Sequence, residues 1–302
     1  MPGVKRAFAW LVKKRWYIRL AVVVLFVGYL KLVGLDGKFY YPDAEVYSVP
    51  ADFGLTHEEV RFTTADGLRL AGWFLPAQGD PKGLIIHFHG NAANVSAHVG
   101  LVAWLPAYGY RVLMFDYRGY GQSEGRVTRA GTIRDATAAI AYALTRPEAA
   151  DLPLFAYGQS LGGAVAIAAT ADRPEVDAVV AESTFGSYRG IAAMHVRSLV
   201  RVGWLSNFLS WLCVSSGYDP IDSIQRIAPR PVLIIAAEDD RICFPALAQE
   251  LFDAASEPKS FWMAPGAEHL GIYATNNREL SRRLTEFFDH AAQNTDKRKK
   301  HP

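Results

Sequence analysis

The sequence predicts an α/β protein with a doubly wound, mostly parallel sheet, and three observations lead to that prediction. Short apolar runs alternate along the chain with segments of helical spacing, as in a parallel sheet covered by helices. The run Leu84–Phe88 is almost continuously apolar, which is typical of a strand buried on both faces. Ala65-Asp66-Gly67 joins the first two strands as a hairpin, so the sheet begins antiparallel. The chain has 302 residues, half of them apolar, which is enough for one large core.

The remaining elements follow from apolar spacing and from Gly and Pro positions. Strands are expected at Val60–Thr63, Leu68–Leu75, Leu84–Phe88, Tyr110–Phe115, Leu154–Tyr157, Val176–Ala181, Val232–Ala236 and Ser260–Met263. Helices are expected at Ser96–Tyr108, Thr132–Leu144, Gly163–Ala169, Phe244–Ala255 and Asn277–Ala291. The interruption from Thr184 to Arg230 is too long for a strand–helix connection and is rich in Trp, Leu and Val. It predicts a small helical cap at about 187–217.

The amino-terminal segment predicts a membrane anchor. Leu20 to Leu30 is an unbroken apolar run, and Tyr17 to Leu35 is about the length that spans a bilayer. Leu32–Gly37 offers a poor cleavage site, so an uncleaved span is preferred over a cleaved signal peptide or an interfacial helix. We therefore expect residues 1–36 to hold a cytoplasmic basic segment and one span, followed by a catalytic domain over 37–293 on the periplasmic or lumenal side.

The charge distribution argues against a nucleic-acid partner. Residues 1–35 contain seven Lys or Arg and no acid, and residues 296–300 add four bases and one acid. The remaining residues 36–295 then hold 32 − 7 − 4 = 21 bases against 30 − 1 = 29 acids. An acidic body does not suit a nucleic-acid surface. The basic tail at 294–302 is expected to be solvated and disordered.

The pentapeptide Gly158-Gln159-Ser160-Leu161-Gly162 stands between a short apolar strand and a helix of small apolar residues. A serine at a strand-to-helix turn, with glycine two residues before and after it, is the arrangement called the nucleophile elbow. The turn is tight enough that side chains at the two glycine positions would clash. It leaves the serine hydroxyl exposed above the sheet. Ser160 is therefore the candidate nucleophile.

An acid and a histidine follow Ser160 in the order that such a fold uses. Asp240 comes after the strand Val232–Ala236 and is our first choice for the acid, with Asp239 and then Glu182 as alternatives. His269 lies on a loop after the last strand and is the candidate base. In these roles His269 takes the proton of Ser160 and Asp240 fixes the imidazole tautomer.

The loop His89-Gly90-Asn91-Ala92-Ala93-Asn94 directly follows a strand and predicts an oxyanion hole. We expect the backbone N–H of Asn91, or of Ala92 as second choice, to act there together with that of Leu161. Asn94-Val95-Ser96 also matches a glycosylation sequon, which we interpret as coincidence.

Two cysteines, Cys213 and Cys243, could pair or remain free. The Cys and His residues do not have the spacing of metal ligands, so the sequence predicts no metal site and no cofactor.

The chain resembles the α/β-hydrolase superfamily and, more closely, its membrane-anchored serine hydrolases with a His-Gly-Asn-Ala-x-Asn loop. In related hydrolases the acid lies three residues past a glycine; here Ala237 stands in that place and Pro245 comes one residue late, so the resemblance favours Asp240 and leaves Asp239 open. The matching segments are Phe39–Pro42, Phe62–Gly67, Gly72-Trp73, His89–Asn94, Asp116–Gly125, Gly158–Gly163, Asp219–Arg226, Pro231–Asp240 and Pro265–His269.

The resemblance implies a hydrolase of carboxylic esters, lysophospholipids or thioesters, so a small-molecule or lipid acyl ester and a membrane are the expected partners. A tethered binding or scaffold protein that has lost catalysis is the alternative from another class, and a serine peptidase is a weaker one. Every member of the predicted triad is present, which favours the hydrolase.

Overall fold

The computed structural model describes residues 17, 21–22, 25, 28–29 and 36–300. Among these residues, the structure contains no helix that is both long enough and apolar enough to cross a bilayer. Most of the expected span from Tyr17 to Leu35 lies outside the described residues.

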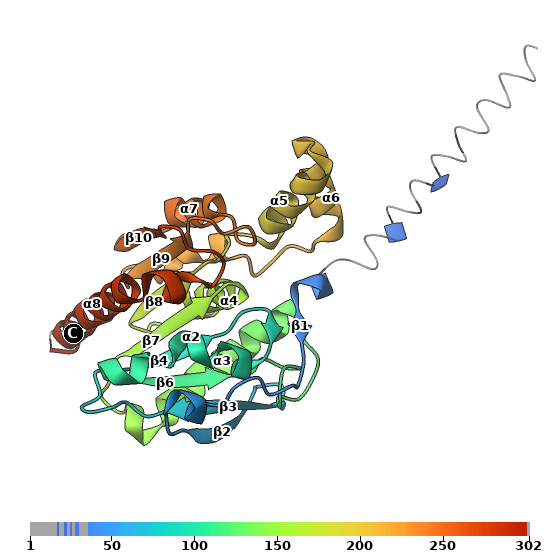
Figure 1. Ribbon diagram of the computed structural model, residues 1–302. Coiled ribbons are helices and arrows are strands. Elements are labelled where there is room, and N and C mark those ends of the chain that lie inside the picture. Colours follow the sequence, from blue (N-terminus) through green and yellow to red (C-terminus); the bar gives the residue numbers. More distant parts are fainter. Residues whose placement is uncertain (1–16, 18–20, 23–24, 26–27, 30–35, 301–302) are drawn as a thin grey trace, which may run out of the picture.

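The described strands and helices alternate as the sequence predicts (Figure 1). The strands are β1 (Tyr41–Pro42), β2 (Glu58–Thr63), β3 (Arg69–Leu75), β4 (Gly83–Phe88), β5 (Ala92–Ala93), β6 (Tyr110–Phe115), β7 (Leu154–Gln159), β8 (Ala178–Glu182), β9 (Val232–Ala237) and β10 (Lys259–Ala264). The α-helices are α2 (Val95–Val102), α3 (Arg129–Thr145), α4 (Leu161–Thr170), α5 (Tyr188–Val200), α6 (Gly203–Cys213), α7 (Pro245–Ala254) and α8 (Ile272–Lys300). Short 3₁₀ turns are η1 (Asp36–Phe39), η2 (Pro50–Phe53), η3 (Leu105–Tyr108), η4 (Pro147–Ala149), η5 (Pro220–Asp222) and η6 (Ile224–Ile227).

Eight of these strands form one sheet in the order β10-β9-β8-β7-β4-β6-β3-β2. β2 and β6 both pair antiparallel with β3, whereas the pairs from β6 through β4, β7, β8 and β9 to β10 are parallel. The chain therefore forms the mostly parallel, doubly wound sheet of the α/β-hydrolase fold. Ligands bind such a sheet at the carboxyl ends of its parallel strands.

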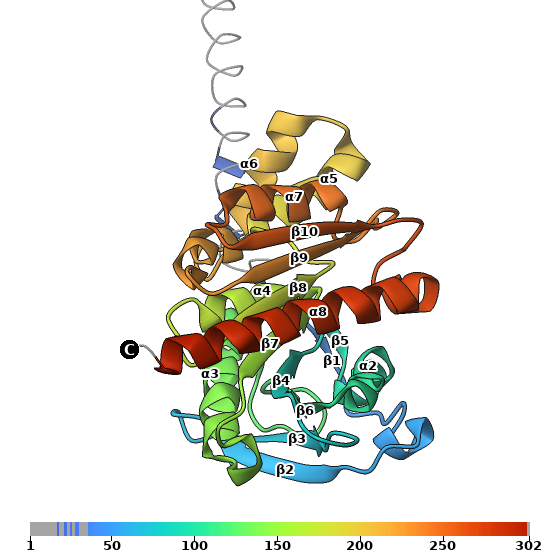
Figure 2. The same cartoon turned by 90° about the vertical axis from the view of Figure 1, so that its left-hand side faces the viewer.

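Helices cover both faces of the sheet and divide the core in two. On one face α3, α4 and α7 belong to a single core cluster that includes Leu84, Ile86 and Phe88 of β4. On the other face α2 and α8 pack in a second cluster that includes Ile85 of the same strand. Figure 2 shows α8 running across that second face. Because successive strand residues point to opposite faces, the central strands are apolar at nearly every position.

Helices α5 and α6 form the expected cap as an antiparallel pair that projects beyond the sheet (Figure 1). The side chain of Ser187 caps α5 by accepting the Gly190 N–H. Helix α5 ends at Arg201, whose backbone is left-handed with φ 54°. The two cysteines lie at different places, Cys213 at the end of α6 and Cys243 beside the sheet, and both are free thiols.

The loop after β6 is fixed by one buried arginine. Arg118 donates to both carboxylate oxygens of Asp135 on α3 and to the carboxylate of Asp66 in the β2–β3 hairpin. Its side chain is 6% exposed and that of Asp135 is completely buried. Paired burial of this kind positions the loop rigidly, because removing either partner leaves an uncompensated charge.

Two expectations need correction. The helix expected at Ser96–Tyr108 is divided into α2 and η3, because Pro106 cannot continue the α-helical hydrogen bonds. Helix α8 continues to Lys300, so residues 294–300 are helical rather than disordered. No glycine or proline interrupts the chain between Gln293 and Lys300. The short pairing of β1 with β5, which joins the amino-terminal segment to the loop after β4, had no signal in the sequence.

Candidate active site

Ser160 stands at the turn between β7 and α4 in a strained conformation. Its φ of 55° and ψ of −123° are values that residues with a side chain rarely adopt. A Cβ atom at Gly162 would lie 1.9 Å from the Phe88 carbonyl oxygen, and one at Gly158 would lie 2.3 Å from the Gly162 oxygen. Glycine at both positions is thus required by backbone contact, as the elbow pattern predicts.

Ser160, His269 and Asp240 form one hydrogen-bonded chain. His269 Nε2 lies 3.0 Å from Ser160 Oγ, and His269 Nδ1 lies 2.7 Å from Asp240 Oδ2. Asp240 is buried and uses its other oxygen, Oδ1, to accept the N–H groups of Ile242 and Cys243, both at 2.8 Å. The three side chains come from three different loops at the carboxyl ends of β7, β9 and β10.

The two alternative acids are oriented elsewhere. Asp239 is exposed to solvent one residue before Asp240. Glu182 is buried under the elbow, where it accepts hydrogen bonds from the Tyr157 hydroxyl and from Gln159 Nε2 at 3.2 Å. Burial raises the pKa of Glu182. Asp240 is therefore the acid that the fold brings to His269.

The loop after β4 runs along the nucleophile. A Cβ atom at Gly90 would lie 3.6 Å from Ser160 Cβ, so the loop passes the serine one residue before Asn91. Leu161 follows the serine directly. Two hydrogen bonds hold the backbone of Asn91, because its carbonyl accepts the Tyr41 N–H at 2.9 Å and the Tyr120 hydroxyl at 2.8 Å. Ala92, the second choice, lies on β5.

The sequon residue Asn94 is a structural residue. Its side-chain oxygen caps α2 through the Ser96 N–H, and its amide nitrogen donates to Asp43 Oδ1 at 3.0 Å and to the Glu45 carbonyl at 2.7 Å. The side chain is 4% exposed. Because the nitrogen is buried and engaged, the structure agrees with interpreting the sequon as coincidence.

Two further residues adjoin the site, and neither has a role that could be predicted from the sequence. His98, on the first turns of α2, is buried, and its ring lies 3.0 Å from a Cβ built at Gly90. Its Nε2 bonds to the Ala92 carbonyl at 3.1 Å, and burial lowers its pKa, so it remains neutral beside His269. Cys243 Sγ lies 4.0 Å from Ser160 Oγ, and burial raises the pKa of this thiol. The only sequence signal for His98 is its place one helical turn after the loop.

The nucleophile also rests on a buried polar network. His87 on β4 bonds through Nε2 to Gln159 Oε1 at 3.0 Å, and Gln159 in turn donates to Tyr157 and Glu182. Burial lowers the pKa of His87 to about 3, so its ring is neutral. These strand residues link β4, β7 and β8 directly below Ser160 and hold the elbow in one position.

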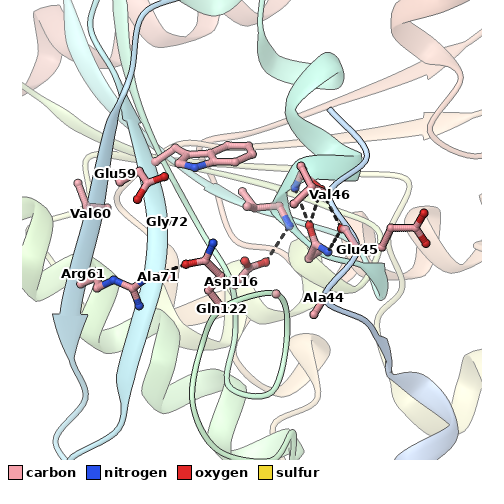
Figure 3. Close-up of a pocket in the computed structure, with 15 residues that line it drawn as sticks. Ala44, Glu45, Val46, Glu59, Val60, Arg61, Ala71, Gly72, Asp116 and Gln122 are labelled. Carbon is pink, nitrogen blue, oxygen red and sulfur yellow. Dashed lines mark hydrogen bonds between the residues drawn. The ribbon is translucent and has the colours of Figure 1, made fainter. Parts of the chain in front are cut away.

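A separate pocket of about 60 Å³ lies between the amino-terminal segment and strands β2 and β3 (Figure 3). Asp116 faces it, accepts the Val95 N–H at 2.7 Å, and has its pKa raised to about 7 by burial. Arg61 donates to Gln122 across its rim at 2.7 Å. None of its lining residues is Ser160, His269 or Asp240. In the described part of the chain, no cluster of His, Cys, Asp or Glu has a geometry that could hold a metal.

Comparisons with known proteins find a family model, relatives and solved structures that are similar to this chain. A model of the family described as serine aminopeptidase, S33, matches residues 79–228. The uncharacterized protein YfhR of Escherichia coli K12 is 35% identical over 266 residues, covering 86% of this chain and 89% of its own. WAV2 of Arabidopsis thaliana, described as an alpha/beta hydrolase domain-containing protein, is 29% identical and covers 88% of this chain and 91% of its own. Among solved structures, the Pyrococcus furiosus esterase Pf2001 superposes with a TM-score of 0.68 at 22% identity, over 83% of this chain and 98% of its own.

Proposed function

This chain belongs to the α/β-hydrolase superfamily, and we propose that it is a serine hydrolase that cleaves carboxylic ester or thioester bonds through an acyl-enzyme. The observation that carries the proposal is the continuous hydrogen bonding from Ser160 through His269 to Asp240. A scaffold protein without catalysis does not need a strained serine, a histidine and a buried acid that are hydrogen-bonded in one chain. That argues against the idle alternative.

The proposed first step forms the acyl-enzyme. His269 Nε2 removes the proton of Ser160 as Oγ attacks the acyl carbonyl carbon, and Asp240 stabilises the imidazolium that results. The carbonyl electrons move to the oxygen, which accepts hydrogen bonds from the backbone N–H groups of Leu161 and Asn91. When the carbonyl re-forms, the bond to the alcohol or thiol breaks, and His269 returns the proton to that leaving group.

The second step hydrolyses the intermediate. A water molecule gives its proton to His269 and attacks the acyl carbon, and collapse of the tetrahedral intermediate releases the carboxylic acid and restores the Ser160 hydroxyl. The neutral state of His98 supports this chemistry, since a second positive charge next to His269 would disfavour the imidazolium.

We propose further that the enzyme is held in a membrane by the run Tyr17–Leu35, with its basic amino terminus cytoplasmic and its catalytic domain periplasmic or lumenal. The support is the apolar run of the sequence and the bias of bases before it.

The test is covalent labelling followed by a substrate panel. A fluorophosphonate probe is expected to label Ser160 in the full chain, with no labelling of Ser160→Ala. The panel compares p-nitrophenyl esters, an acyl thioester and an aminoacyl p-nitroanilide, the last because the matching family model is described as an aminopeptidase. Labelling without turnover of any ester would support the idle alternative, and turnover of the anilide alone would support a peptidase.

A further inference from the structure

Helix α6 presents its three large aromatic side chains outward. Trp204 is 74% exposed, Phe208 46% and Trp211 52%, and their spacing of four and three residues gives them one helix face. The residues of α6 that are buried are smaller or aliphatic: Ser206, Ser210, Leu212 and Cys213. A helix that faces water on one side normally turns its large apolar side chains toward the body and exposes polar ones. The outward face of α6 is therefore built for contact with something other than water.

The turn between α5 and α6 extends this apolar surface. Leu199 is 85% exposed and Val202 is 39% exposed, and the exposed side chains of Arg197 and Arg201 lie beside them in the sequence. We refer to Leu199, Val202, Trp204, Phe208 and Trp211 as the cap face. Soluble monomers rarely expose so many large apolar residues together, and such a patch marks an interaction site.

The charge of the cap is opposite to that of the rest of the body. Residues 187–218 contain Arg189, Arg197 and Arg201 and no Asp or Glu. Residues 36–295 hold 21 bases and 29 acids in total, so the part outside the cap has 21 − 3 = 18 bases against 29 acids. An acidic body thus carries one basic, aromatic projection, which is complementary to an anionic surface.

The apolar amino-terminal run joins the body at the foot of this cap. Asp36 Oδ1 accepts the N–H of Ser215, two residues after α6, at 3.2 Å. The Phe39 ring packs edge-on against Tyr188, the first residue of α5, with centroids 5.2 Å apart. Both views show η1 at the end of the molecule from which α5 and α6 project (Figures 1 and 2). The run Tyr17–Leu35 ends one residue before this point.

The base of the cap also touches the catalytic loop. His195 on α5 bonds through Nε2 to the Ile242 carbonyl at 3.0 Å, and the next residue, Cys243, lies 4.0 Å from Ser160 Oγ. Ile242 itself is 50% exposed. The cap that carries this face is therefore in direct contact with the loop beside the triad.

We propose that the cap face docks onto a lipid bilayer that carries anionic headgroups. Tryptophan and phenylalanine suit the bilayer interface, and arginines beside them add attraction to anionic lipid. A bilayer is favoured over a protein partner because the apolar run long enough to enter one ends at the foot of the same projection. Docking of the cap face does not depend on chemistry at Ser160. Together with the proposed hydrolase activity, docking would let the enzyme take its acyl esters from that bilayer.

The first experiment uses a fluorescent reporter in the full chain reconstituted into phosphatidylcholine–phosphatidylglycerol vesicles. Asn207→Cys, exposed between Trp204 and Trp211, is labelled with a nitrobenzoxadiazole group, and Asp80→Cys, exposed in the β3–β4 turn, is the matched control. Parallel labelling of the unsubstituted protein measures the background from Cys213 and Cys243, both buried. We expect a blue shift and quenching by nitroxide-labelled lipid at position 207 and neither at position 80.

Equal spectra at the two positions would overturn the proposal. A blue shift that nitroxide lipid does not quench, and that grows with the protein-to-lipid ratio, would assign the cap face to a second copy of the chain instead.

The second experiment compares two substrates in the same vesicles. The triple variant Trp204→Ser, Phe208→Ser, Trp211→Ser should hydrolyse a soluble short-chain ester within about twofold of the parent, but a vesicle-borne long-chain ester about tenfold or more slowly. Leu144→Ser removes an exposed apolar residue from α3 and should change neither rate. Equal losses on both substrates, or on neither, would contradict docking through the cap face. If the parent hydrolyses no ester, the proposed function fails while the reporter experiment still decides the docking.

Discussion

Replacing Asp240 by asparagine changes one atom of the proposed triad, and the surroundings of that residue determine the consequence. Asp240 Oδ1 accepts two backbone N–H groups at 2.8 Å, from Ile242 and Cys243. An asparagine must keep its oxygen there, because an amide nitrogen would oppose two donors. Its NH₂ group then faces His269 Nδ1, which lies 2.7 Å from Oδ2 in the parent.

The imidazole can accept from this NH₂ group only if Nδ1 carries no proton. The proton then resides on Nε2, which lies 3.0 Å from Ser160 Oγ and can no longer remove the serine proton. The expected loss in kcat/KM is about 10⁴-fold, which corresponds to about 5.4 kcal/mol of transition-state stabilisation. The fold should remain, since the asparagine keeps both backbone hydrogen bonds.

The assay is kcat/KM on a soluble p-nitrophenyl ester, accompanied by the rate of fluorophosphonate labelling and a thermal unfolding curve. Asp239→Asn is the matched control, because it makes the same chemical change at the exposed neighbouring residue and should leave the rate within about twofold. A loss smaller than about tenfold in Asp240→Asn, or an equal loss in the control, would refute the assignment.

Four other substitutions and conditions probe the fold and its placement. Ser160→Gly should be more stable to unfolding than Ser160→Ala by about 1 kcal/mol, because glycine relieves the strain of a φ of 55°; equal melting temperatures would argue against strain. Gly162→Ala should lower stability by about 3 kcal/mol or more in denaturant titration, because its Cβ would lie 1.9 Å from a backbone oxygen, while Gly203→Ala, with open space around it, should change little. Burial raises the pKa of Asp116 from 3.8 to about 7, so the stability that its neutral carboxyl contributes is complete below pH 3.8 and is lost as the pH rises to about 7; the loss is at most about 4 kcal/mol, and Asp116→Asn should flatten the fall in denaturant midpoint between about pH 4 and 8. The full chain should stay in membranes after a carbonate wash, and removal of residues 1–35 should give a soluble, active protein, whereas a mature terminus near residue 37 would indicate a cleaved signal.

The sequence alone was sufficient to predict the sheet, the tight turn at Ser160 and the candidate base His269. Strand positions follow from the period of apolar residues, and the glycines around Ser160 follow from the space that a Cβ atom needs. Both can be recognised in consecutive residues of the sequence. His269 could be predicted because the loop after the last strand must end at the same edge of the sheet as Ser160. A helical cap could be predicted from the length and apolar content of one segment, whereas its division into two helices could not.

Other features depended on contacts between residues far apart in the chain. Asp239 and Asp240 are adjacent and chemically identical, and only the turn that buries one and exposes the other distinguishes them. The role of His98 beside Gly90 likewise required the packing of α2 against the loop, since its own neighbours in sequence carry no catalytic pattern.

The outward aromatic face of α6 and the free state of the two cysteines were also decided by tertiary structure. The sequence of α6 shows a helix with apolar residues over most of its circumference, but it does not state which of them the body covers. Packing of the helix buries Ser206, Ser210 and Leu212 and leaves the tryptophans outside. Sequence determines which faces a helix has, whereas burial depends on what the rest of the chain brings against it, and that is a property of the whole fold.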